Sequence, residues 1–230
     1  MEGTGRLFGP LLRILPQELR ADVVAYPVDR FIDYAGLTDH VRALLPRESP
    51  FVLVAESFSG PIALRLASAP PHGLKGIVLV CTFAASPDPW AHRWLRWLAG
   101  AWIFRMPPPV CLVRAFLLGR EAPDDLVRET VAVLRSVRPE VLASRLRMVL
   151  EIGPADRSGP GTVPVLYLQG RGDRLLGRRG LRTVLALKPD TAVVEIDGPH
   201  LLLQTRPEEA LRRIGPFLKQ IGRPDGPGRP

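Results

Sequence analysis

Disulfide-forming and metal-binding residues are scarce in this chain. Its 230 residues include two cysteines and four histidines. Cys81 ends one apolar run and Cys111 lies inside another, so the sequence predicts two buried thiols that serve as small apolar residues. Their spacing indicates neither a disulfide nor a metal site, and we expect no cofactor.

Long hydrophobic runs and lysine are scarce as well. No stretch reaches the ~18 uncharged apolar residues of a membrane span, and no signal-like segment opens the chain, which favours a cytoplasmic protein without stable membrane insertion. The formal net charge is +8. Arginines are scattered through every segment, however, and lysine occurs only at Lys75, Lys188 and Lys219, so we expect no nucleic-acid partner.

The apolar content indicates one folded domain. Apolar residues make up 46% of the chain and charged residues 23%, which is ordinary for a globular protein of this length. We expect a single domain over residues 1–222 and a disordered, glycine- and proline-rich tail at 223–230. Between two strand candidates, residues of about 87–152 show helical patterning, which predicts a helical cap insertion.

The predicted cap contains all four tryptophans. Trp90, Trp94 and Trp97 are spaced i, i+4, i+7 and share one helical face. Such a stripe would either bind acyl or aromatic groups above a pocket or pack the cap onto the main domain. The apolar stretches 99–104 and 110–118 leave interfacial membrane contact as a third alternative.

One segment has the pattern of a strand, a tight turn and a helix, with a serine in the turn. Phe51–Val54 is an apolar strand candidate, and Ser57 follows it directly before a helical pattern. Such a turn needs small residues two positions away on either side, and the chain has Ala55 and Ser59 there. The pattern A-x-S-x-S is a relaxed form of the nucleophile elbow G-x-S-x-G.

A nucleophilic serine needs a histidine to take its proton and a carboxylate to orient that histidine. Asp173 follows the strand candidate at 163–170, and His200 follows a second one at 191–196. The stretch between the two residues has room for one helix and one strand. The carboxyl ends of three parallel strands would therefore bring Ser57, Asp173 and His200 to one edge of a sheet.

With its polar residues in this order, the chain resembles the α/β-hydrolase superfamily. The stretch P-V-L-Y-L-Q-G-R-G-D-R, at 164–174, is similar to the acid-bearing strand and loop of that family. G-P-H-L-L-L-Q-T-R-P-E-E-A, at 198–210, resembles its histidine loop and final helix. The resemblance covers about residues 1–222 and implies a mainly parallel α/β sheet flanked by helices.

Other acids and histidines remain as alternatives. Asp173 could be a plain loop carboxylate paired with Arg171 or Arg174. The other histidines lie in a helical stretch, in a turn and in the tryptophan-rich segment, and none is as well placed as His200. The remaining candidates are the acids Asp88 and Asp197 and the histidines His40, His72 and His92.

The amino end departs from the family pattern. Residues 3–12 resemble the loop and helix that follow the first central strand, but that strand is missing and Met1 falls where the second oxyanion donor should come from. In the family the missing strand lies between the strand candidates 23–26 and 51–54, so both are expected to have unpaired edges. We expect either a true start further upstream or a truncated product.

The three residues imply a serine hydrolase that cleaves a carboxylic ester or related acyl bond of a small molecule. Ser57 would attack the carbonyl, His200 would carry the proton, Asp173 would orient the imidazole, and the backbone N–H of Phe58 would bind the oxyanion. A thioesterase, a carbon–carbon hydrolase or an acyltransferase would use the same residues. The alternative is a non-catalytic or truncated protein of this fold that acts as a binding module.

Overall fold

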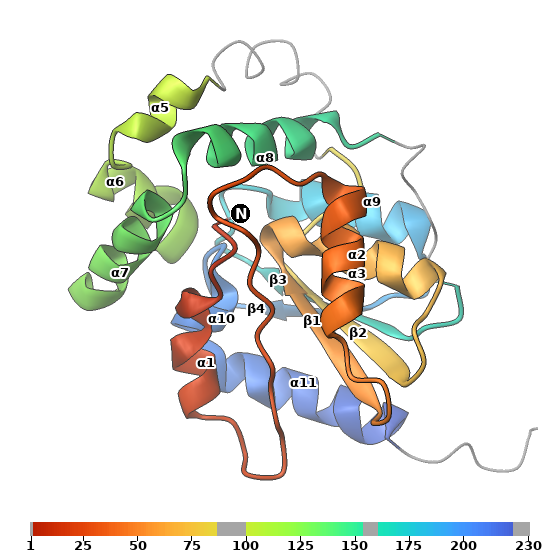
Figure 1. The fold of residues 1–230 in the computed structure, drawn as a ribbon. Coiled ribbons are helices and arrows are strands. Elements are labelled where there is room, and N and C mark those ends of the chain that lie inside the picture. Colours follow the sequence, from red (N-terminus) through yellow and green to blue (C-terminus); the bar gives the residue numbers. More distant parts are fainter. Residues whose placement is uncertain (1, 87–99, 154–160, 223–230) are drawn as a thin grey trace, which may run out of the picture.

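A four-stranded parallel sheet forms the centre of the protein. The computed structural model describes residues 2–86, 100–153 and 161–222 (Figure 1). The strands are β1 (Phe51–Glu56), β2 (Leu74–Val80), β3 (Val165–Gly170) and β4 (Ala192–Ile196), and they lie side by side in this order. The central strands β2 and β3 are rich in buried aliphatic residues because helices cover both of their faces.

Helices pack on the two faces of the sheet in separate groups (Figure 1). Alternate residues of β2, Val78 and Val80, contact one group, which contains α10, α11 and the amino-terminal α1. The intervening residues, Ile77 and Leu79, contact α3 and α9 on the opposite face. This alternation follows from the two-residue period of a strand.

The described helices connect the strands in the order expected for an α/β protein. Those of the main domain are η1 (Arg6–Phe8), α1 (Gly9–Arg13), α2 (Tyr34–Leu44), η2 (Ser57–Ser59), α3 (Gly60–Ser68), α9 (Gly177–Leu187), α10 (Leu202–Thr205) and α11 (Pro207–Ile221). The strand candidates at 51–54, 163–170 and 191–196 are confirmed, with ends that differ by one or two residues.

Between β2 and β3 the described chain is helical. This insertion contains α5 (Ala101–Arg105), α6 (Val110–Leu112), η3 (Val113–Leu118), α7 (Asp124–Arg135) and α8 (Pro139–Glu151). Helix α8 runs across the top of the main domain in Figure 1, on the side of α2, α3 and α9 where β1 ends. The tryptophan stripe at 90–97 lies outside the described residues.

Two expectations from the sequence are wrong. Residues 21–27 are drawn out but form no strand, because no strand of the described sheet pairs with them; the N–H of Tyr26 donates to the carbonyl of Gly3 at 2.6 Å. Strand β1 is therefore an edge of the described sheet. Cys81 is buried as predicted, whereas Cys111 is exposed, since the short helix α6 contributes no buried residue.

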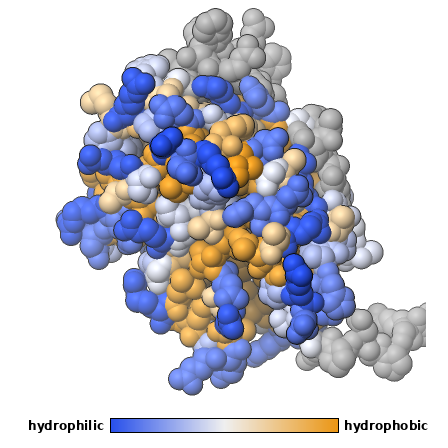
Figure 2. Space-filling view, viewed as in Figure 1, coloured by the Kyte–Doolittle hydropathy of each residue, from blue (hydrophilic) through white to orange (hydrophobic). Residues whose placement is uncertain are grey.

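The edge beside β1 is apolar. Val54 of β1 is 43% exposed and Val23, in the extended segment before α2, is 40% exposed. Figure 2 shows a broad apolar area in the lower half of this face, where Figure 1 draws α1, the extended segment and β1. Among the described residues, no helix is long and apolar enough to cross a bilayer.

Candidate active site

Ser57 occupies a strained turn at the carboxyl end of β1. Its φ angle is 55°, in the left-handed region that a residue with a Cβ adopts only at a cost. The chain turns there from strand β1 into η2 and then into α3. The serine side chain is only partly buried, as a nucleophile must be to meet a substrate.

Gly60 and Thr82 fix the shape of this turn. A Cβ on Gly60 would lie 2.7 Å from Cγ2 and 2.8 Å from Cβ of Thr82, so only glycine fits. The hydroxyl of Thr82 donates to the carbonyl of Ser57. Ser59 is hydrogen-bonded to the hydroxyl of Tyr26 at 3.1 Å. The position that demands glycine in this elbow is thus Gly60, whereas Ser59 is tolerated.

His200 and Asp173 lie in line with Ser57. The Nε2 atom of His200 is 2.8 Å from the Oγ of Ser57, and its Nδ1 atom is 3.1 Å from Oδ2 of Asp173. The side chains of His200 and Asp173 are 1% and 0% exposed. Within the described residues neither Nδ1 nor Oδ2 has another hydrogen-bond partner, so the two atoms are left for each other.

The loop after β3 holds Asp173 ionised. Its Oδ1 accepts the N–H groups of Leu175 and Leu176 at 2.9 and 3.0 Å. Burial by itself would raise the pKa of Asp173, but the hydrogen bond and charge of His200, together with these N–H groups, outweigh it and lower the pKa below its ordinary value. The carboxylate is therefore suited to stabilise an imidazolium.

The loops that bear Asp173 and His200 are bonded to each other. Backbone hydrogen bonds of 2.9 Å run from Arg171 N–H to Ile196 O and from Gly172 N–H to Gly198 O. A Cβ on Gly170 would lie 2.6 Å from the carbonyl of Pro199, so glycine is needed for this close approach. The geometry of the acid and the histidine is thus set by backbone contacts between neighbouring strands.

Comparison with known proteins assigns the chain to a family. Residues 3–214 match a family described as the alpha/beta hydrolase family. The chain belongs to the alpha/beta hydrolase family. A comparison with curated protein sequences found no significant match.

Solved structures share the alpha/beta hydrolase fold with this chain. A thermophilic esterase from Thermogutta terrifontis is 18% identical, with a TM-score of 0.75 and coverage of 96% of this chain and 87% of the esterase. A hydrolase from Oleispira antarctica is 13% identical, with a TM-score of 0.76 and coverage of 95% and 88%. An esterase from Exiguobacterium antarcticum is 13% identical, with a TM-score of 0.74 and coverage of 94% and 88%. At these identities the likeness establishes the fold.

The alternative acid and histidines that the structure describes do not join this alpha/beta hydrolase site. Asp197 is exposed, and Arg171 pairs with Glu195 at 3.2 Å rather than with Asp173. The Nε2 atom of His40 is 2.9 Å from the carbonyl of Ala25. His72 is exposed, and both Asp88 and His92 lie outside the described residues.

Phe58, the predicted oxyanion donor, directly follows Ser57 in the turn. Its side chain is 1% exposed and stacks on Tyr34 with ring centroids 5.1 Å apart, which anchors the backbone at this position. Met1, where the family pattern puts a second donor, lies outside the described residues. Residues beside it still reach the elbow, because Gly3 bonds to Tyr26 and Tyr26 bonds to Ser59.

Sequence reasoning missed a buried arginine beside the elbow. Arg145 of α8 is 2% exposed, and it donates to the carbonyls of Glu2 and Pro27 at 2.8 Å each. Its guanidinium carbon lies 5.9 Å from the ring centres of both Tyr26 and Phe58. The insertion, the amino-terminal segment and the elbow therefore meet at one side chain. Only a helical pattern containing an arginine on its apolar face could have indicated it.

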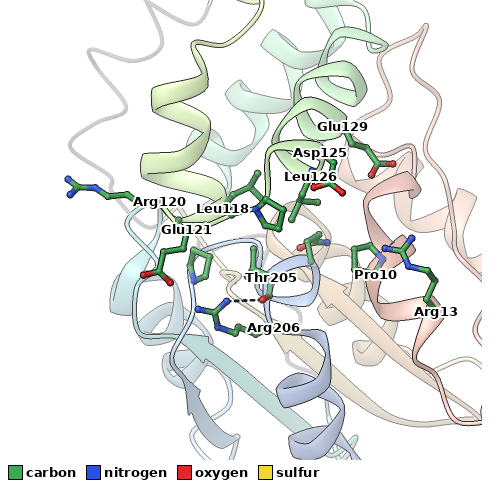
Figure 3. A pocket seen from close by; sticks show the side chains of 15 residues that line it. Pro10, Arg13, Leu118, Arg120, Glu121, Asp125, Leu126, Glu129, Thr205 and Arg206 are labelled. Atoms are coloured by element: carbon green, nitrogen blue, oxygen red, sulfur yellow. Dashed lines mark hydrogen bonds between the residues drawn. The ribbon is translucent and has the colours of Figure 1, made fainter.

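A cavity of about 420 Å³ lies beside the histidine loop (Figure 3). Its walls come from α1, the chain between η3 and α7, helix α7 and the segment 199–206. Figure 3 shows Pro10 and Arg13 on one side, Arg120 and Glu121 on the other, and Thr205 and Arg206 below. Ser57, Asp173 and His200 do not line it, so it lies behind the histidine rather than over the serine.

The site offers neither an alternative nucleophile in Cys81 nor a metal cluster. Burial raises the pKa of the Cys81 thiol well above its ordinary value, so the thiol stays protonated and inert. In the part of the chain that the structure describes, no group of three or more histidines, cysteines or acids could hold a metal ion. Ser57 is partly exposed at this edge of the sheet, whereas Cys81 is buried.

Proposed function

We propose that this alpha/beta hydrolase is a serine hydrolase that cleaves a carboxylic ester or related acyl bond. The observation that carries the proposal is the 2.8 Å approach of His200 Nε2 to the hydroxyl of Ser57, with Asp173 behind the imidazole. A strained serine backbone at the same position supports it, since such strain is typical of functional sites.

The proposed reaction has two steps, acylation of Ser57 and hydrolysis of the acyl-enzyme, and both use these groups. Ser57 Oγ attacks the acyl carbon while His200 Nε2 takes its proton, and Asp173 stabilises the resulting imidazolium. The oxyanion forms against the N–H of Phe58. When it collapses, His200 gives the proton to the leaving alcohol and an acyl-enzyme ester remains on Ser57. Water then attacks that ester by the same route and releases the acid.

A serine nucleophile restricts the reaction to substrates that can form an acyl-enzyme. A serine forms an acyl ester that water can hydrolyse, whereas the dehalogenases and epoxide hydrolases of this fold use a carboxylate at that position. Thioesters, activated carbon–carbon bonds and acyl transfer would require the same three residues. We propose oxygen esters of small carboxylic acids as the first class of substrate, and we keep the predicted cytoplasmic location as part of the proposal.

A serine-directed fluorophosphonate probe tests the nucleophile. We expect the probe to label the wild-type chain and Ser59→Ala but not Ser57→Ala, because Ser57 alone among the described serines has a histidine within hydrogen-bond distance. Nitrophenyl esters of graded acyl length then test the reaction, and Ser57→Ala should lower kcat/KM by ~10⁴-fold or more. A folded wild-type protein that takes up no probe would favour the non-catalytic binding module instead.

A further inference from the structure

A second buried carboxylate, Glu56, lies directly before Ser57. It is the last residue of β1 and is 7% exposed. Its Oε1 accepts the backbone N–H of Leu203 at 3.1 Å, and its Oε2 accepts the side-chain amide of Gln204 at 2.9 Å. Leu203 and Gln204 are themselves 0% and 5% exposed. The carboxylate therefore makes both contacts inside the protein.

These contacts join the two halves of the site. Glu56 is covalently next to Ser57, and Leu203 and Gln204 belong to α10, which begins two residues after His200. On the other side of the loop, the N–H of Leu201 donates to the carbonyl of Leu117 in the insertion at 2.8 Å. The backbone that carries His200 is thus attached to the strand of Ser57 through Glu56 and to the insertion through Leu117.

Packing alone gives no reason for a carboxylate at this position. An ionised group in a protein interior is costly unless hydrogen bonds satisfy it, and an apolar residue of similar volume would fill the space at lower cost. Burial raises the pKa of Glu56 above its ordinary value, although the N–H of Leu203, the amide of Gln204 and the nearby His200 oppose that rise. The clamp that Glu56 forms is a reason to keep the carboxylate there.

We propose that Glu56 is a positioning residue, whose carboxylate clamps α10 to the nucleophile strand and thereby holds the imidazole of His200 against the hydroxyl of Ser57. This inference rests on the serine hydrolase function proposed above. Glu56 does not touch the reacting atoms; it acts on them through the backbone that follows His200. Its charge also favours the imidazolium that forms when Ser57 attacks.

Two substitutions separate the clamp from the charge. Glu56→Ala removes both contacts and leaves the amide of Gln204 and the N–H of Leu203 without their acceptor. Glu56→Gln keeps the shape, and it can keep both bonds if the amide of Gln204 turns over. The Oε1 atom of Gln204 has no hydrogen-bond partner among the described residues. After the turn it would accept a hydrogen bond from the side-chain amide introduced at position 56. Glu209→Gln, at a surface ion pair on α11, is the matched control.

Steady-state kinetics on a nitrophenyl ester provide the first measurement. We expect Glu56→Ala to lower kcat by ~10²-fold with KM changed less than about threefold, because misplacing the imidazole affects the transition state and not substrate binding. The kcat of Glu56→Gln should lie within about tenfold of the wild-type value, and the kcat of Glu209→Gln should equal the wild-type value. Wild-type kcat in Glu56→Ala, or equal losses in both Glu56 variants, would overturn the clamp.

A second measurement needs no turnover and separates this inference from the proposed function. The Nδ1 proton of His200, between the ring and Asp173, should give a far-downfield proton NMR signal in the wild type and in Glu56→Gln. We expect it to be lost in Glu56→Ala while thermal unfolding remains cooperative. A wild-type protein without esterase activity would refute the function only. The same downfield signal in Glu56→Ala would refute the positioning role.

Discussion

The two ends of the sheet differ in how the segments beside them are held, although β1 and β4 are both edge strands. Beside β3 and β4, the loops that carry Asp173 and His200 are bonded to each other, and every residue of β3 is buried. Beside β1, the neighbouring segment 21–27 is extended but forms no strand, and Val54 is 43% exposed. We call the end at β3 and β4, whose loops are hydrogen-bonded to each other, the paired end. At the other end, the turn of Ser57 is held by side-chain contacts, among them the hydrogen bond from Thr82 to the carbonyl of Ser57 and the bond between Tyr26 and Ser59.

Substitution of the acid tests the paired end and should have the largest effect. Asp173→Asn keeps the size of the side chain but removes the charge opposite Nδ1 of His200. We expect kcat on a nitrophenyl ester to fall by ~10⁴-fold, because the imidazole loses its required tautomer and its counter-charge. Asp22→Asn, at an exposed ion pair with Arg20, should retain wild-type activity and serves as the control. An active Asp173→Asn protein would remove Asp173 from the proposed mechanism.

The same carboxyl predicts how stability depends on pH. Its pKa is lowered in the folded protein, so its contribution is complete above the unfolded value of about 3.9 and is lost as the pH falls through the folded pKa. The unfolding free energy of the wild type, measured in urea, should therefore decline on acidification below about pH 4 more steeply than that of Asp173→Asn. Parallel curves for the two proteins would contradict this assignment.

The strands that carry the candidate site could be predicted because their sequence signals are local. Ser57, Asp173 and His200 each follow a recognisable strand, and parallel strands bring their carboxyl ends to one edge. Glu56 could not be predicted in the same way, since its partners are 147 and 148 residues away in the chain. Its identity as a buried carboxylate emerges only when α10 packs against β1.

The wrong predictions have a physical reason in common. Val23–Tyr26 has the β-branched composition of a strand, but composition cannot supply the neighbouring backbone that a strand needs. Cys111 has apolar neighbours in sequence, yet α6 is a single short turn and its residues face outwards. In both cases a local pattern indicated the prediction, and the missing information was which other segment lies alongside.

Substitution at the elbow tests the turn that follows β1. Gly60→Ala would bring a methyl group against the side chain of Thr82, which also donates to the carbonyl of Ser57. We expect a loss of about 1–3 kcal/mol in unfolding free energy and a lower kcat, since Thr82 must move. Gly215→Ala, where a new Cβ would meet nothing within 4 Å on α11, should instead be neutral or stabilising by up to ~1 kcal/mol. Equal effects at both glycines would refute the steric account.

The smallest effect, on the free energy of unfolding, is expected at the exposed edge of β1. Val54 of β1 and Val78 of β2 are partners in the parallel ladder, yet Val54 is 43% exposed and Val78 is 0% exposed. Val78→Thr buries a hydroxyl between packed helices and should cost about 1–3 kcal/mol of unfolding free energy in urea. Val54→Thr has nearly the same shape but meets solvent, so its cost should stay below about 0.5 kcal/mol. A loss at Val54 as large as that at Val78 would mean that the edge of β1 is covered in solution, and the contrast between the two ends of the sheet would disappear.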